Sequence, residues 1–240
     1  MKYTIISDIH SNFIALSAFD KICDKDAILL CLGDIIGYGA QPVECIKYIR
    51  KIASIAVKGN HERMLINEQY KKFANPFAVA AIEWSEKVIP HNYRTYIEAL
   101  SDKVELGADY LLVHGSVIHP DEYITSKSKA RDSIVELKNA GRKIAFFGHT
   151  HIPGIYDSDG AFHYEEDKEI RLDKDRQYLI NPGSIGQPRD RDPRASFCIF
   201  DTKEKSVIFH RFDYDIQKSA SLIIEKGLPP SLGNRLFYGY

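Results

Sequence analysis

Short apolar runs alternate with longer amphipathic stretches through the first half of this 240-residue chain. An apolar run that is rich in β-branched residues and closed by a turn predicts a buried strand. Such strands are expected at residues 3–7, 27–32, 54–58, 103–106, 110–113 and 143–147. Helical periodicity is expected at residues 12–25, 42–51, 63–100 and 128–139, with breaks near Pro76 and Pro90. This alternation predicts an α/β fold with parallel strands.

The second half of the chain has a different pattern. Residues 154–172 alternate between polar and apolar positions around a Ser-Asp-Gly turn, which predicts an antiparallel hairpin. Further strands are expected within residues 177–212, followed by a helix at about 215–226 and a Gly/Pro-rich tail. Two mixed sheets packed face to face, each covered by helices, would accommodate both patterns. The length fits one α/β domain, so we expect a single domain over residues 1–240.

Five of the expected strands end in residue types that bind metal ions. In chain order these residues are Asp8, His10, Asp34, Asn60, His61, His114, His149 and His151. The carboxyl ends of the strands form the ligand-binding edge of an open α/β sheet, so these side chains are expected in one place. Strand alternation would also put Asp8 and His10 on the same face.

The donor types in this set predict a centre that holds two metal ions. No cysteine belongs to the set, and mixed oxygen and nitrogen ligands favour Mn²⁺, Fe or Zn²⁺ over soft-metal chemistry. A carboxylate has two oxygens and can bridge two cations. The set is too large for a single ion. We expect two divalent cations, with Mn²⁺ as the first choice and Fe, Zn²⁺ or Ni²⁺ as alternatives.

Composition narrows the classes of partner. The 32 Lys and Arg residues balance 33 Asp and Glu residues, which leaves no electrostatic footprint for long nucleic acid. The apolar runs are far shorter than the ~20 residues that span a bilayer, and no signal peptide precedes the first strand. We therefore expect a cytoplasmic protein that acts on a small phosphoester or nucleotide, with no membrane partner and with reduced cysteines.

The ordered motifs D-x-H, G-D, G-N-H-E, H-G and G-H-x-H resemble those of the calcineurin-like metallophosphoesterase superfamily. They stand at Asp8–Asn12, Gly33–Gly39, Gly59–Glu62, His114–Ser116 and Gly148–His151. Within the superfamily the chain is similar to small prokaryotic phosphodiesterases grouped with diadenosine tetraphosphatases, whose closing motif resembles residues 181–197. The resemblance covers residues 3 to about 215 and implies a four-layer α/β/β/α sandwich.

The resemblance also implies a role for each motif residue. One metal site would use Asp8, His10, Asp34 and His151, and the other would use Asp34, Asn60, His114 and His149. Asp34 would bridge the two ions, which would share the hydroxide that attacks phosphorus. His61 would stand beside the scissile phosphate as a general acid or transition-state stabiliser. Asn12 and Arg189 would contact the substrate.

The charge of such a centre favours phosphodiesters or phosphoanhydrides. Two divalent cations, two carboxylates and a bridging hydroxide would leave about +1, which nearly balances a phosphodiester. We therefore expect a phosphodiesterase or a nucleoside-polyphosphate hydrolase of the diadenosine tetraphosphate type. The alternatives are a phosphomonoesterase or protein phosphatase, and a scaffold protein of this fold without catalysis. Ile36-Gly37-Tyr38 and Lys58 replace the Asp-Arg pair and the arginine of the protein phosphatases, which weakens that alternative.

Two further segments bear on the substrate. The helical segment 63–100 is expected to border the active site, and its Tyr70, Phe73 or Phe77 could stack on a nucleobase, the alternative being that they pack in a helix core. Residues 189–194 are rich in arginine, with Arg189 as the expected phosphate contact. The alternative for this segment is that its charges pair with one another on a solvated loop.

Overall fold

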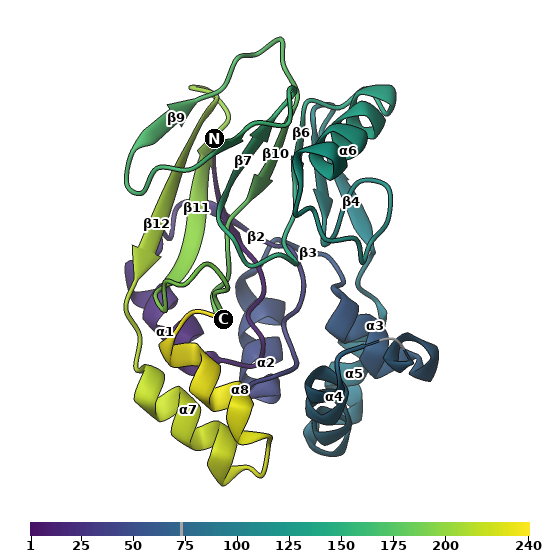
Figure 1. Cartoon of the computed structure of the whole chain (residues 1–240), viewed down its shortest axis with the longest axis vertical. Helices are drawn as coiled ribbons and strands as arrows, with labels where there is room; N and C mark the ends of the chain where they lie inside the picture. The colour runs from purple at the N-terminus through teal and green to yellow at the C-terminus, as the bar shows by residue number, and fades with distance from the viewer. Residues whose placement is uncertain (73) are drawn as a thin grey trace.

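Two mixed sheets form the centre of the molecule (Figure 1). The structure is a computed structural model and describes residues 1–72 and 74–240, within which each sheet has six strands. The first sheet has the order β3-β2-β1-β11-β12-β9. Its strands, in chain order, are β1 (Lys2–Ile6), β2 (Ile28–Cys31), β3 (Ile55–Ala56), β9 (Glu169–Arg171), β11 (Ala195–Asp201) and β12 (Ser206–Phe212). Strands β1, β2 and β3 are parallel, and β11 pairs antiparallel with β1.

The second sheet has the order β4-β5-β6-β10-β7-β8. Its strands are β4 (Lys103–Leu106), β5 (Tyr110–Val113), β6 (Ile144–Phe146), β7 (Gly154–Asp157), β8 (Phe162–His163) and β10 (Tyr178–Asn181). Strands β5, β6 and β10 are parallel, and the outer pairs are antiparallel. Each sheet thus contains three adjacent parallel strands, at one side of the first sheet and in the centre of the second, because these strands are joined by helical crossovers or long connections.

The helices begin where the sequence offers a cap or a first-turn proline. They are α1 (Phe13–Ile22), α2 (Pro42–Ile52), α3 (Asn60–Ile66), η1 (Glu68–Lys71), α4 (Pro76–Val88), α5 (His91–Glu98), α6 (Lys127–Asn139), α7 (Ile216–Glu225), α8 (Pro230–Asn234) and η2 (Arg235–Phe237). Pro42 and Pro76 occupy the first turns of α2 and α4, where a missing N–H costs nothing. The Ser126 side chain accepts from Lys129 N at the start of α6.

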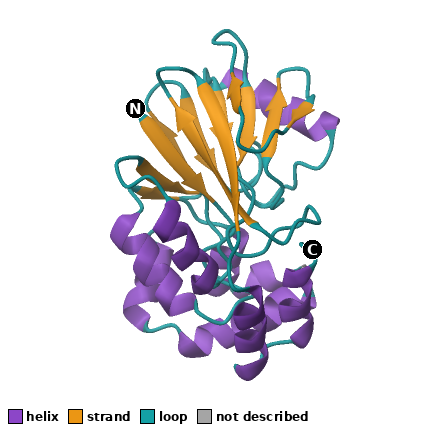
Figure 2. Cartoon of the chain, turned by 90° about the vertical axis from the view of Figure 1, so that its left-hand side faces the viewer, coloured by secondary structure: helices purple, strands orange, loops and turns teal. Residues whose placement is uncertain are grey.

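Three apolar cores hold the layers together. Side chains such as Ile5, Phe146 and Phe200 fill the space between the two sheets. The outer face of the first sheet packs against α1 and α2 in a core that continues into α4 and α7, and α6 covers the outer face of the second sheet. Figure 2 shows most helices gathered at one end of the strands, with α6 apart from them. This is the α/β/β/α sandwich expected from the sequence, and the fold prediction is confirmed.

The structure corrects three local expectations. The predicted hairpin at residues 154–172 is formed only by β7 and β8, while β9 joins β12 in the other sheet. The tail after Lys226 is not irregular but forms α8 and η2. Strand β1 ends at Ile6, so strand alternation does not place Asp8 and His10. In the described parts of the chain, no helix has both the length and the apolarity needed to cross a membrane.

Candidate metal centre

The predicted ligands lie on loops that follow parallel strands of both sheets. Strands β1, β2 and β3 of the first sheet lead to Asp8, Asp34 and Asn60, and β5 and β6 of the second lead to His114 and His149. The carboxyl ends of these strands meet at the junction of the two sheets. The site therefore needs the face-to-face packing of both sheets, and one open sheet would not build it.

Five ligand residues have left-handed backbones, which replace the strand geometry that the sequence suggested. The φ angles of Asp8, His10, Asp34, His149 and His151 are 54°, 48°, 51°, 65° and 61°. This conformation costs an L-residue roughly 1–2 kcal/mol. Strain of this kind persists where the surrounding structure over-determines it, and it clusters at functional sites. Turns in these loops, and not strand alternation, bring the side chains of Asp8 and His10, and of His149 and His151, to the cluster.

The first group of donors consists of Asp8, His10, Asp34 and His151, all buried. His10 Nε2 lies 3.1 Å from His151 Nε2, and His151 Nε2 lies 3.2 Å from Asp8 Oδ1. His10 Nε2 is also 3.6 Å from Asp34 Oδ2. Donors that share a metal at ~2.1 Å stand roughly 3.0–3.4 Å apart at the edges of an octahedron or tetrahedron. The spacing within this group therefore fits one cation.

The second group consists of Asp34, Asn60, His114 and His149. His114 Nε2 lies 3.3 Å from Asp34 Oδ2, 3.1 Å from Asn60 Oδ1 and 3.2 Å from His149 Nδ1. Asp34 Oδ2 thus faces imidazole nitrogens of both groups. Its other oxygen, Oδ1, accepts a hydrogen bond of 2.9 Å from His61 N. Asp34 has the position that a bridging carboxylate requires.

The imidazoles are oriented by main-chain carbonyls. His10 Nδ1 lies 3.2 Å from the carbonyl oxygen of Ile36. His114 Nδ1 lies 2.8 Å from that of Leu32, and His149 Nε2 lies 3.1 Å from that of Asp121. His151 Nδ1 makes the same contact with the carbonyl of Gln187. A ring nitrogen that donates to a carbonyl leaves the other nitrogen able to bind a metal, and this fixes both tautomer and ring orientation. In each ring that other nitrogen faces the cluster.

The charges in the cluster also fit cations. Burial opposes ionisation of Asp34, but the imidazoles of His114, His61 and His10 hold the pKa of its carboxyl well below the usual value. Burial would lower the pKa of His114, yet the Asp34 carboxylate raises it to about 9. A proton on His114 thus compensates Asp34 in the metal-free chain. Because metal ions displace such protons from their ligands, the donor set suits divalent cations.

His61, the predicted catalytic residue, lies beside the cluster but does not belong to either donor group. Its Nε2 is 4.0 Å from Asp34 Oδ2, and its ring packs edge-on against Tyr38 at 4.5 Å between centroids. Burial lowers the pKa of His61 to about 4, so the ring is uncharged at neutral pH. A Cβ on Gly37 would stand 2.0 Å from His61 Nδ1, and this explains the glycine there.

Glu62 closes the G-N-H-E motif and has a structural role that the motif alone does not indicate. Its carboxylate is buried and accepts hydrogen bonds from the backbone N–H groups of Asp34 and Gly59 at 2.8 Å and of Ile36 at 3.1 Å. Burial and the charge of Asp34 raise the pKa of Glu62 to about 7. Glu62 stands three residues after the N-cap Gly59 and accepts from its N–H, which is one half of a capping box; glycine has no side chain to form the other half. Glu62 holds the loop that carries Asp34.

Arg63 positions the loop that orients His149. Its guanidinium donates to the Asp121 carboxylate, to Asp102 Oδ1 at 2.8 Å and to the carbonyls of Pro120 at 2.9 Å and Lys58 at 3.1 Å. The Asp121 carbonyl in turn accepts from His149 Nε2. No local pattern in the sequence indicates this arrangement, since Arg63 and the 120–121 loop meet only in the folded chain.

The two residues predicted to contact the substrate, Asn12 and Arg189, differ in what their side chains bond to. Asn12 Oδ1 caps α1 by accepting from Ala15 N at 3.1 Å and also accepts from Ser219 Oγ at 3.0 Å. Its Nδ2 donates to Gly186 O at 3.0 Å. These three hydrogen bonds give Asn12 a role in holding the fold, and the substrate contact expected of it stays a prediction.

Arg189, in contrast, points toward the centre. Its Nη2 lies 3.3 Å from Tyr38 Oη and 3.2 Å from Gln187 Oε1. Its charge contributes to lowering the pKa values of His10 and His151, after the larger effect of burial. The expected alternative, pairing within the loop, holds for Arg194, which bonds to Asp192.

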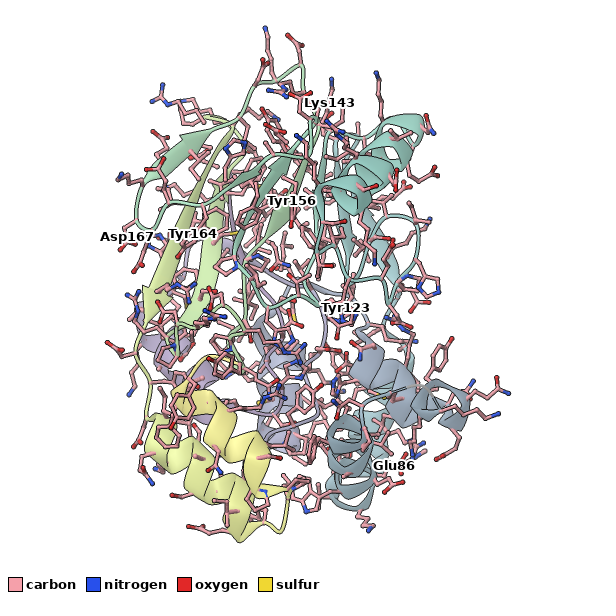
Figure 3. The ribbon with its side chains drawn as sticks, in the orientation of Figure 1. Glu86, Tyr123, Lys143, Tyr156, Tyr164 and Asp167 are labelled. Carbon is pink, nitrogen blue, oxygen red and sulfur yellow. The ribbon has the colours of Figure 1, made fainter. Side chains whose placement is uncertain are left out.

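A cavity of about 740 Å³ opens beside the second donor group. Asn60 and His149 reach it from the centre, and its wall is formed by η1, the nearby turns of α3 and α4, and residues 121–123. Tyr70 lines it, whereas Phe77 is exposed and is not among the lining residues; Phe73 lies outside the described residues. Tyr123 also lines it and stacks on the His149 ring at 3.7 Å between centroids. Figure 3 shows Tyr123 between the strands and α3.

Comparison with known proteins agrees with this site. Residues 1–205 match the family model of the calcineurin-like phosphoesterase superfamily domain. An uncharacterized protein of Methanocaldococcus jannaschii is 39% identical over 242 residues, which are 98% of this chain and 97% of the relative. A metallophosphoesterase from Sphaerobacter thermophilus, solved by crystallography, is 35% identical with a TM-score of 0.88 over the full length of both chains.

A more distant structure supports the fold alone. A hypothetical protein from Pyrococcus horikoshii has a TM-score of 0.81 at 19% identity, covering 100% of this chain and 98% of the other. The family match and the two relatives above 30% identity extend through every motif that supplies the cluster. The chain therefore belongs to the calcineurin-like phosphoesterase superfamily and is a metal-dependent phosphoester hydrolase.

Proposed function

We propose that this chain hydrolyses phosphodiesters or nucleoside polyphosphates at a centre of two divalent cations. The observation that carries the proposal is the position of Asp34 Oδ2, which lies 3.6 Å from His10 Nε2 in one donor group and 3.3 Å from His114 Nε2 in the other. One ion would be held by Asp8, His10, Asp34 and His151, and the second by Asp34, Asn60, His114 and His149. When bound, such ions activate water and neutralise phosphoryl oxygens.

The protein's own side chains would orient the substrate and assist the departure of the leaving group. His61 stands next to the bridging carboxylate, and its uncharged ring would donate a hydrogen bond from Nε2 to the leaving oxygen and so stabilise the charge that develops there. Arg189 would hold a phosphate oxygen, since a guanidinium binds phosphate in a bidentate manner. The 740 Å³ cavity would take the leaving group, and the rings of Tyr70 and Tyr123 on its wall suit a nucleobase. Cavity and donor groups share Asn60 and His149, so a bound leaving group would lie next to the phosphate.

Charge supports a diester or anhydride over a simple monoester. Asp8 and Asp34 are the buried carboxylates of the donor groups and would offset two of the four positive charges of the ions. The attacking hydroxide would offset a third, so the remaining charge of about +1 would nearly balance a phosphodiester or a single anhydride phosphate. Mn²⁺ is our first choice of metal, because the donors are oxygen and nitrogen in nearly equal parts.

A hydrolysis screen with Mn²⁺ tests the proposal. Its substrates are bis-p-nitrophenyl phosphate, p-nitrophenyl phosphate, diadenosine tetraphosphate and cyclic nucleotides, and Asp34→Asn serves as the inactive control. We expect a diester or the dinucleoside polyphosphate to have the highest kcat/KM. A clear preference for p-nitrophenyl phosphate, or no turnover of any compound by the metal-loaded chain, would contradict it.

The role of His61 can be tested on the same substrates. The variant His61→Ala should keep its metal content, because His61 lies outside both donor groups, and should lose about 10²–10⁴-fold in kcat. The loss should shrink for p-nitrophenolate, a leaving group that needs little protonation. A loss of equal size for every leaving group would instead assign His61 to phosphate positioning.

A further inference from the structure

Two arginines from distant parts of the chain converge on one tyrosine beside the metal centre. Arg189 lies in the loop between β10 and β11, and Arg235 begins η2 near the C-terminal end. The guanidinium carbon of each lies 5.7 Å from the centroid of the Tyr38 ring. That ring also packs against His10, at 4.7 Å, and His61, at 4.5 Å. The two positive charges therefore stand at the edge of the metal centre.

Neither guanidinium has a carboxylate within 4.0 Å among the residues that the structure describes. Arg189 uses only Nη2 in hydrogen bonds to uncharged groups, and its Nε is buried without a partner in the described chain. Two nearby arginines in the sequence are neutralised: Arg194 pairs with Glu166 and Asp192, and Arg211 pairs with Asp190. Arg50, Arg131 and Arg191 also lack such a partner, but they are exposed to water. Among the described residues, Arg189 and Arg235 are therefore the arginines that are partly buried without a counter-charge.

An uncompensated pair of this kind is costly to the unliganded protein. A buried charge normally has a partner of opposite sign, and like charges at close range destabilise each other. Burial and the nearby charge of Arg189 both lower the pKa of Arg235. An anion between the two guanidinium groups would remove the repulsion and occupy the free Arg189 Nε. Phosphate oxygens match the planar fork of arginine in geometry and charge.

We propose that Arg189 and Arg235 bind a second phosphate group of the substrate, next to the phosphate that is hydrolysed at the metal centre. The proposal rests on the function proposed above and narrows the substrate class to compounds with two or more linked phosphates, such as nucleoside polyphosphates. Tyr38 lines the 740 Å³ cavity and also contacts both arginines, so it would separate the phosphate chain from the nucleoside.

A binding experiment that needs no turnover tests the assignment. AMP and the non-hydrolysable α,β-methylene-ADP differ in one phosphate, and their Kd values for the full-length, Mn²⁺-loaded chain can be measured by calorimetry at a buffered free Mn²⁺ concentration. We expect the wild type to prefer the diphosphate. Loss of one charge-assisted contact in Arg235→Ala should weaken diphosphate binding about 10–100-fold and AMP binding far less. Arg235→Lys, which keeps the charge without the fork, should be intermediate.

Two controls separate a phosphate contact from a structural or long-range effect. Arg191→Ala removes the same charge from an exposed position in the Arg189 loop and should leave both Kd values unchanged. Without ligand, Arg235→Met, which keeps an unbranched stem against Tyr38 and removes the charge, should melt no lower than the wild type, because the change relieves repulsion. A lower melting temperature, or an equal loss of AMP and diphosphate binding, would assign Arg235 to the fold and overturn the proposal.

The outcomes also separate this inference from the proposed function. A chain that hydrolyses bis-p-nitrophenyl phosphate but binds AMP and the diphosphate equally has the proposed function without the second phosphate site. A chain that turns over no phosphoester but still loses diphosphate binding with Arg235→Ala has the site without the proposed function.

Discussion

The variant Arg63→Met should lower both the stability of the protein and its affinity for one of the two metal ions. The Arg63 side chain is 5% exposed, and its donors hold Asp121, Asp102 and two main-chain carbonyls. Methionine fills part of the same space but donates no hydrogen bond. The carbonyl of Asp121 would lose its fixed position, and the His149 ring that donates to this carbonyl would lose its orientation.

The size of the stability loss follows from the exposure of each partner. Asp102 is 58% exposed and can regain water, so its pair with Arg63 contributes ~0–1 kcal/mol. Asp121 is 25% exposed, so the loss there should be smaller than the 3–5 kcal/mol that breaking a fully buried pair typically costs. With the two carbonyls left short of a donor, we expect a total of about 2–4 kcal/mol in the free energy of unfolding. Denaturant unfolding of the metal-free proteins measures this difference.

The metal effect should be confined to the second donor group. Mutation of a residue that orients a ligand typically costs about 10–100-fold in affinity, and we expect this for the ion bound by His114 and His149. The ion bound by Asp8, His10 and His151 should keep its affinity, because the distal nitrogens of His10 and His151 bond to Ile36 and Gln187 instead. Calorimetric titration with Mn²⁺ should therefore change from two tight sites to one tight and one weakened site.

The matched control is Asp102→Asn, which removes the charge of one carboxylate partner of Arg63 but leaves the Asp121 loop in place. It should cost under ~1 kcal/mol and leave both ions bound. If Asp102→Asn and Arg63→Met weaken metal binding alike, or if Arg63→Met weakens both ions to the same extent, the path from Arg63 through Asp121 to His149 is refuted.

Two further predictions concern the ions themselves. Asp34→Asn should lose both ions while Asp8→Asn loses one, because Asp34 Oδ2 faces both donor groups; elemental analysis after Mn²⁺ loading gives the count, and equal contents in the two variants would show that Asp34 is not the bridge. Chelation should lower the melting temperature and Mn²⁺ should restore it, since a ligand at 100 times its Kd stabilises the folded state by about 2.7 kcal/mol. An unchanged melting temperature in differential scanning calorimetry would argue against a structural contribution of the ions.

Local sequence was sufficient for most elements and for the identity of the donors. The strands at β1, β2, β5 and β6 were predicted within one or two residues, because short apolar runs between turns have few other ways to be buried. The polar residues at the strand ends followed from the same pattern. The mixed-sheet arrangement was also predictable, because alternating and continuous apolar runs need different partners.

The boundaries and the hairpin were less predictable, because their cause is not local. Strand β9 is three residues long and pairs with β12, so its sheet is decided by a partner far along the chain. The helical tail packs Leu232 and Leu236 into the core beneath the first sheet, and a Gly/Pro-rich composition alone does not show this. Asn12 stands in a ligand-rich motif, yet the start of α1 and the approach of Ser219 use its amide.

The sequence by itself thus determined which residues can bind metal and the order in which strands present them, because the donor types and the apolar runs that precede them are both local features. Only the tertiary structure decided how they are used. Packing of the two sheets brings Asp34 Oδ2 between two sets of imidazoles, and carbonyls from other loops choose which nitrogen of each ring faces inward. Arg189 and Arg235 both contact Tyr38 for the same reason. Contacts between segments that are remote in sequence depend on the packing of the whole chain.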